Sequence, residues 1–340
     1  MTAAEAVLAI MWLGLTAYAL FGGADFGAGF WDLLAGGPER GRAPRRHIEH
    51  SLGPVWEANH VWLIFVLVVL WTSFPPAFAA IASTLYIPLT LAALGMIARG
   101  AAFAFRHSVD QLVLQRFFGA SFAFSSVTTP FFLGTIAGAV ASGRVPPGIA
   151  AGDVITSWLN PTSILGGVIA VGACAFLAAV YLCSDAARHG DLALVEYFRI
   201  RAIVTALAVG AVALGGIAVL RADAPQLFDG LISRGLPVIA VSAVAGIGSI
   251  FLLVRTQPGP ARVAAALAVT AVIWGWALAQ YPYLLQPVLT VQDAAAGAAT
   301  LRAMLISLVV GAALLVPSLV FLFTLFQQGH ESATSPAQDH

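Results

Sequence analysis

The stretch Tyr18-Ala-Leu-Phe-Gly-Gly-Ala-Asp25-Phe-Gly-Ala-Gly-Phe-Trp-Asp32 lies in the first apolar run of the chain and carries two carboxylates. At helical spacing, both carboxylates share one face of this run with Tyr18, Gly22 and Gly29. An ionisable group inside hydrocarbon costs about 2.5–3.5 kcal/mol on insertion scales, so it usually faces a partner, water or a proton path. Glycines beside it let another helix approach closely. The stretch therefore predicts a tightly packed membrane helix that carries a functional acid.

The composition of the chain is that of an integral membrane protein. It is 60% hydrophobic and only 9% charged, with a mean hydropathy of +0.91. A soluble domain is typically about 25% charged. The formal net charge is zero, which argues against nucleic-acid binding.

We predict an all-α fold with about nine transmembrane helices in a single membrane domain over residues 1–326, because each span needs about 20 apolar residues. The polar tail at 327–340 is predicted to be disordered and cytoplasmic. The expected spans are 5–34, 54–73, 79–98, 117–140, 162–182, 202–220, 235–254, 263–281 and 303–326.

The arginines predict the orientation of these spans. The connections at 36–53, 99–116, 183–201 and 255–262 hold twelve arginines, and the opposite set holds four. The positive-inside rule then places the N-terminus outside and the C-terminus in the cytoplasm. Every hydrophilic segment is short, which excludes a soluble catalytic or nucleotide-binding domain.

A second motif opens the second span, in the sequence Gly53-Pro-Val-Trp56-Glu57-Ala-Asn59-His60-Val-Trp-Leu. The helix dipole favours a carboxylate in the first turn of a helix, where Glu57 is expected. Together with the deeper Asp25, this acid at the membrane edge could pass protons inward through water or hydroxyls. The simpler alternative is a well-anchored helix start with an interfacial aromatic residue, and His60 fits a hydrogen-bonded interfacial residue better than a ligand.

Two further charged residues stand out. Of the basic residues near the end of the third span, Arg99 is nearest to the hydrocarbon, so we expect it to have a specific carboxylate partner. Asp293 follows the sequence Tyr281-Pro-Tyr-Leu-Leu-Gln-Pro-Val-Leu-Thr-Val-Gln and is expected to be a loop or N-cap residue.

The sequence predicts no haem, other cofactor or metal bound by this chain alone. Haem ligation in a helix bundle needs facing His, Met or Cys residues, and the histidines and methionines of this chain are scattered. Cys174 and Cys183 match neither a redox pair nor a zinc site, and are expected to be small core residues.

In these motifs the chain resembles subunit II of the cytochrome bd-type quinol oxidases, including the cyanide-insensitive branch. The resemblance rests on residues 22–29, on residues 54–63, on the region of Arg99, on residues 130–138 and on residues 289–295. These five motifs run in family order and cover almost the whole chain.

The resemblance implies a subunit of a terminal oxidase that takes electrons from membrane quinol and reduces O₂ to water. It implies two four-helix bundles plus one peripheral helix, packed against subunit I, which carries haem b and haem d. It further implies a proton-uptake path at Glu57, where many members have Asp, with Asp25 as the first-helix acid. Trp56, Asn59, His60, Arg99 and Asp293 are supporting residues. A structural quinone and a small single-span accessory subunit occur in some such complexes.

Two other functions stay open at this point. A proton-coupled secondary transporter would also have a Gly-rich first helix with a buried acid, although no inverted repeat is evident. A purely structural subunit would use Asp25 and Glu57 only to fix helix contacts.

Overall fold

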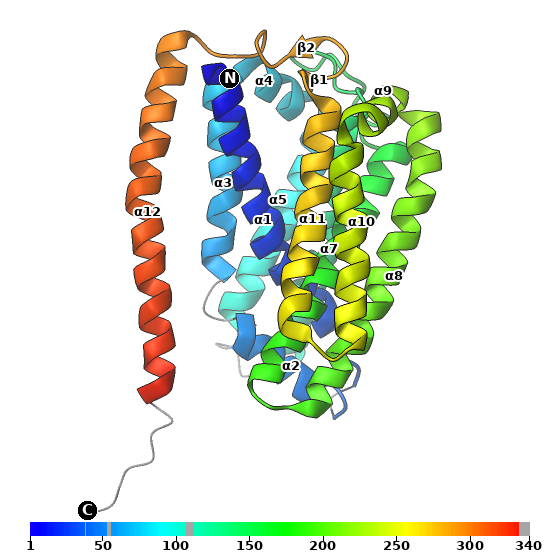
Figure 1. Ribbon diagram of the computed structural model, residues 1–340, viewed down its shortest axis with the longest axis vertical. Coiled ribbons are helices and arrows are strands. Elements are labelled where there is room, and N and C mark those ends of the chain that lie inside the picture. The colour runs from blue at the N-terminus through cyan, green and yellow to red at the C-terminus, as the bar shows by residue number, and fades with distance from the viewer. Residues whose placement is uncertain (38, 53–55, 107–111, 333–340) are drawn as a thin grey trace, which may run out of the picture.

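The structure is a computed structural model that describes residues 1–37, 39–52, 56–106 and 112–332. Most of these residues are helical, as Figure 1 shows. The helices are α1 Ala3–Leu33, α2 Arg42–Leu52, α3 Trp56–Ser73, α4 Pro75–Thr84, α5 Tyr86–Arg106, α6 Leu112–Ala141, α7 Pro161–Arg188, α8 Leu192–Asp223, α9 Pro225–Gly230, the π-helical turn η1 Leu231–Gly235, α10 Leu236–Val254, α11 Pro258–Gln280 and α12 Ala298–Ser332.

The length and apolar character of these helices make the chain a multi-pass membrane protein. Within the described ranges, seven helices are long and apolar enough to cross a membrane. Residues 59–73 and 75–84 form a further pair bent by 119°, and Tyr86–Ala102 is a shorter apolar helix. The all-α class is confirmed, whereas the count of nine spans stays a prediction.

The bend between α3 and α4 changes the expected boundaries. Phe74 has φ −136° and ψ 57°, outside the helical region, and two prolines follow it. A residue before proline is pushed away from helical geometry, while proline itself suits the first turn of a helix. A second break at Leu85 separates α4 from α5. The segment 79–98, expected to be one span, is therefore divided between α4 and α5.

Helix α1 holds the bundle together. It packs against α3, α6, α7 and α11. Helix α12 lies at the edge of the molecule and packs against α1 and α3 (Figure 1). The division into two four-helix bundles and one peripheral helix stays a prediction.

Helix α2 was not expected, because its sequence is hydrophilic and lies in a segment predicted to be a loop. It packs against α1 and α7. Arg45 Nε lies 3.4 Å from a carboxylate oxygen of Asp32 at the end of α1, and Ser51 donates a 2.6 Å hydrogen bond to Asp185 of α7. We call this end of the bundle, with α2 and the α7–α8 and α10–α11 connections, the Arg-rich end (Figure 1).

The opposite end is closed by the segment between α11 and α12. It contains a short antiparallel hairpin of β1 Tyr283–Leu285 and β2 Leu289–Thr290. Beyond the hairpin, Gln292 donates a 2.9 Å hydrogen bond to the hydroxyl of Thr2, which caps α1. The backbone N–H of Ala296 donates to the Ser73 carbonyl at the end of α3. This segment therefore ties the first and third helices to the last.

Candidate functional site

A buried ion pair joins α1 to α5. The Nη2 atom of Arg99 lies 2.7 Å from Oδ1 of Asp25 and also donates a 3.0 Å hydrogen bond to the Asp25 backbone carbonyl. Each side chain is only 1% exposed. Both residues lie roughly 10–12 Å inside the ends of their helices, seven or eight residues at 1.5 Å each. The prediction that Arg99 has a carboxylate partner is confirmed.

A third helix completes the surroundings of Arg99. Its Nη1 donates a hydrogen bond to the hydroxyl of Ser126 on α6, and its guanidinium lies 4.2 Å from the ring centroid of Phe122 and 5.2 Å from that of Phe26. A Cβ atom at Gly29 would lie 2.6 Å from Cβ of Ser126. The close helix approach predicted for the glycines of α1 is therefore found at Gly29, where α6 meets α1 beside Arg99.

The sequence did not identify Ser126 or Phe122 as partners of Arg99. Ser126 was visible only as one of several hydroxyl residues in the segment 125–129, and a single sequence does not say which face of α6 meets α1. A signal was nevertheless present, because Gly29 marks the place where α6 comes close.

Helix α3 brings further members of the predicted site to the same place. His60 packs its ring 5.8 Å from the ring centroid of Phe26, and the side-chain amide of Asn59 donates a 3.3 Å hydrogen bond to the Phe21 carbonyl. Trp56 and Glu57 lie in the first turn of α3, but their side chains fall outside the described residues. The first turn of α3 is therefore followed, one turn later, by His60, whose ring contacts Phe26 beside Asp25.

The two oxygens of the Asp25 carboxylate have different surroundings. Oδ1 accepts from Arg99, whereas Oδ2 is buried and has no hydrogen-bond partner among the described residues. A buried polar atom is nearly always satisfied by protein or by ordered water. One oxygen of this acid is therefore anchored by a permanent charge, and the other is available to a water or a proton.

Asp293 lies far from this ion pair. It accepts a 2.5 Å hydrogen bond from Thr290, beside the Gln292 contact to Thr2. Thr2 and Asp25 are 23 residues apart along α1, roughly 34 Å at 1.5 Å per residue. Asp293 is the loop residue that was expected, and the structure does not bring it to Asp25.

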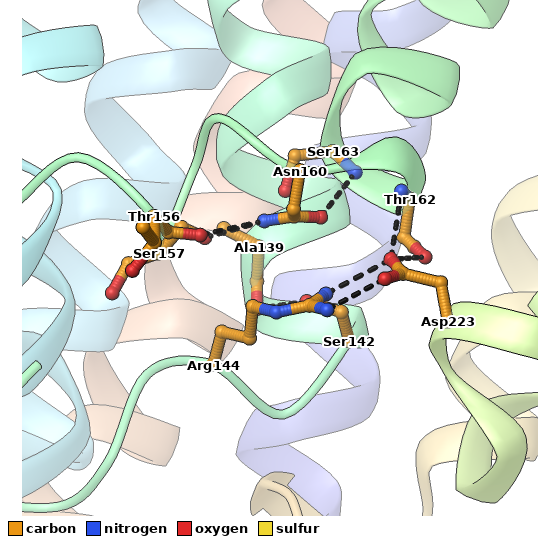
Figure 2. Close-up of polar contacts among 9 residues, drawn as sticks. All are labelled: Ala139, Ser142, Arg144, Thr156, Ser157, Asn160, Thr162, Ser163 and Asp223. Atoms are coloured by element: carbon orange, nitrogen blue, oxygen red, sulfur yellow. Dashed lines mark hydrogen bonds and ion pairs between the residues drawn. The ribbon is translucent and has the colours of Figure 1, made fainter. Parts of the chain in front are cut away.

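A second polar cluster ties together α6, α7 and α8 at the hairpin end of the bundle. Figure 2 shows Arg144 donating two parallel hydrogen bonds to Asp223, at 2.6 and 2.9 Å. Thr162 at the start of α7 donates both its backbone N–H and its hydroxyl to the same carboxylate. We call these three residues the Arg144 clamp. It fixes the ends of three helices, which is a structural task.

We predict that Asp223→Asn will destabilise the folded chain by about 1–2 kcal/mol, since an amide cannot accept the arginine fork, and the partly exposed pair is partly screened by solvent. The measurement is thermal unfolding in detergent. Asp229→Asn, an exposed acid on the nearby α9, is the matched control and should leave the midpoint unchanged. Equal midpoints for the two variants would contradict a stabilising role of the clamp.

Within the described ranges, no three His, Cys, Asp or Glu side chains gather as metal ligands. The polar side chains gathered around Asp25 and Arg99 are the candidate site.

Comparisons with known proteins agree on one family. The family model described as cytochrome bd terminal oxidase subunit II matches residues 3–326. The chain is 33% identical over 147 residues to cytochrome bd ubiquinol oxidase subunit 2 of Bacillus subtilis (strain 168), covering 43% of each protein. It is 27% identical over 175 residues to cytochrome bd-I ubiquinol oxidase subunit 2 of Escherichia coli (strain K12), covering 49% of this chain and 45% of the relative.

These two alignments span less than half of each relative, whereas the structural match covers nearly the whole of both chains. A chain in the structure of bd oxidase from Geobacillus thermodenitrificans matches with a TM-score of 0.76 at 26% identity, over 96% of this chain and 99% of that one. The arrangement of helices is therefore shared from end to end.

Proposed function

Because this chain belongs to the family of cytochrome bd terminal oxidase subunits II, we propose that it is the haem-free partner of a quinol-oxidising, O₂-reducing complex and supplies a path for protons. The relatives named as ubiquinol oxidase subunits, and the likeness to a bd oxidase structure, support this assignment. The haems b and d of subunit I supply the O₂ chemistry. This chain then contributes a scaffold in the membrane and the groups that hold and move protons.

The proposed path starts at the Arg-rich end, which the distribution of arginines assigns to the cytoplasm. Glu57 stands in the first turn of α3, where it can take up a proton from the aqueous side. His60 follows one turn deeper and packs against Phe26, the residue next to Asp25. Asp25 is the next proton-binding group of this path, deeper in the helix bundle.

The single observation that carries the proton role is the half-anchored carboxylate of Asp25. If the pair with Arg99 served only to join two helices, both carboxylate oxygens would be expected to find protein partners. Instead, one oxygen is held by the guanidinium and the other is buried without a partner among the described residues. Arg99 keeps the acid oriented, and the second oxygen can exchange hydrogen bonds with water.

We predict that Glu57→Gln in the assembled complex lowers quinol-dependent O₂ consumption by about a hundredfold, the lower end of the usual contribution of a proton-transfer group. The haem difference spectrum should be unchanged, because this chain is proposed to hold no haem. Glu57→Asp should restore most of the rate, since it keeps a carboxylate at the position.

The matched control is Glu196→Gln, an exposed glutamate on α8 at the same end, paired with Arg199. It should leave turnover unchanged. Unchanged turnover in Glu57→Gln would refute the proton path. Isolation of the chain with its neighbours but without any haem-containing partner would refute the oxidase assignment as a whole.

A further inference from the structure

Four buried polar atoms, at the Asp25–Arg99 pair or within two helical turns of it or of its partner Ser126, have no hydrogen-bond partner among the described residues. Two belong to α1, namely Oη of Tyr18 and Oδ2 of Asp25, and the others are Nε of Arg99 on α5 and Oγ1 of Thr129 on α6. Tyr18 is 7% exposed and the other three side chains are at most 1% exposed. Several orphaned polar atoms around one ion pair are unusual in a folded protein, where such groups are almost always satisfied.

The position of Tyr18 is set by a glycine. A Cβ atom at Gly22 would lie only 3.0 Å from Cε2 and 3.6 Å from Cζ of the tyrosine ring. The ring therefore lies over Gly22, and its hydroxyl stands on the side of α1 that carries Asp25. A larger residue at position 22 would push the ring away from this face.

The surroundings of the hydroxyl are the same groups that surround the acid. The His60 ring lies 5.8 Å from the ring of Phe26, the residue next to Asp25, and the Arg99 guanidinium lies 5.2 Å from the same Phe26 ring. The ring centroids of Tyr18 and His60 are 6.3 Å apart. Through His60 and Phe26, Tyr18 is thus a near neighbour of the ion pair.

We propose that Tyr18 is the relay residue that follows Asp25, and that buried water joins its hydroxyl to the free carboxylate oxygen. This inference rests on the proton path proposed above. Water is the ordinary partner of buried polar atoms that protein leaves unsatisfied, and it needs several such atoms to be held. The four orphaned atoms supply both donors and acceptors for it.

A tyrosine hydroxyl suits this task. It can accept a hydrogen bond from one water while it donates to the next, so a proton arriving on one side leaves from the other with no net change in charge. Tyr18 lies seven residues from Asp25 toward the N-terminus of α1, which is roughly 10 Å farther from the Arg-rich end. The relay therefore carries protons deeper than Asp25 alone could.

The test is Tyr18→Phe in the assembled complex, which removes the hydroxyl and keeps the ring over Gly22. We expect turnover to fall about tenfold, the loss that corresponds to one hydrogen bond missing from the path. The rate at which quinol reduces the haems without O₂ should stay at the wild-type value, and the ratio of turnover in H₂O to that in D₂O should rise. A merely structural role of the hydroxyl would not change this ratio.

The matched control is Tyr197→Phe, whose hydroxyl is likewise buried without a partner among the described residues but whose ring lies against Arg201 on α8. It should behave as wild type. If Tyr18→Phe also keeps wild-type turnover while Glu57→Gln is slow, the relay is refuted and the proton path stands. If Tyr18→Phe and Glu57→Gln both have wild-type turnover, the relay and the proton path are both refuted.

Discussion

Replacing Arg99 with Met is expected to lower the free energy of unfolding by about 3–5 kcal/mol, because the Asp25 carboxylate would stay buried without its countercharge. Three helices would be affected at once, since the same guanidinium holds α1 through Asp25 and α6 through Ser126. The measurement is the thermal unfolding midpoint of the purified complex, together with the yield of chain from membranes.

Two further variants make this prediction specific. Arg221→Met, at an exposed position near the end of α8, should leave the midpoint unchanged. The double variant Asp25→Leu, Arg99→Met should recover most of the loss, because replacing a whole buried ion pair by apolar groups is often nearly neutral. A wild-type midpoint in the single Arg99 variant would contradict the stabilising role of the pair.

Gly27→Ala is the second substitution from which we expect a large effect. A Cβ atom at this position would lie 1.8 Å from the backbone oxygen of Cys174 and 2.4 Å from its carbonyl carbon. Backbone atoms cannot turn aside as a side chain can, so α1 and α7 would have to separate. We expect a loss of stability of about 1–3 kcal/mol or more, which is typical of overpacking, and a reduced yield of assembled complex.

Gly23→Ala is a matched control on the same helix against the same partner. Its Cβ would lie 3.5 Å from the Cys174 sulfur, which is ordinary contact distance. Because alanine favours a helix over glycine by about 1 kcal/mol, this variant should be neutral or slightly stabilised. Equal loss in both variants would mean that the helices do not meet at Gly27 as closely as the structure has them.

The buried pair of Asp25 and Arg99 was the most predictable part of the site. A charge in hydrocarbon must find a partner, so Asp25 and Arg99 could be expected to matter before either was placed. That these two residues pair with each other, and that Ser126 joins them, could not be predicted, because a single sequence does not say which helices become neighbours. The roles of Glu57, Asn59 and His60 stay predictions.

The short elements could not be predicted from apolar length. Helix α2 is hydrophilic, and its position depends on contacts such as Ser51 with Asp185, which are distant in sequence. Helix α4 follows α3 with no charged residue between them, and the prolines after Phe74 mark the bend. Hydropathy detects how long a segment is apolar, whereas its direction is set by local backbone geometry.

The hydrogen bond between Thr2 and Gln292 joins residues that are 290 positions apart. A ribosome adds about 5–20 residues per second, so the two partners are made roughly 15–60 seconds apart. During that time α1 can already lie in the membrane, but the cap at its N-terminal end lacks its last partner. The protein is therefore closed at this end only near the completion of its synthesis, by the segment that leads into α12.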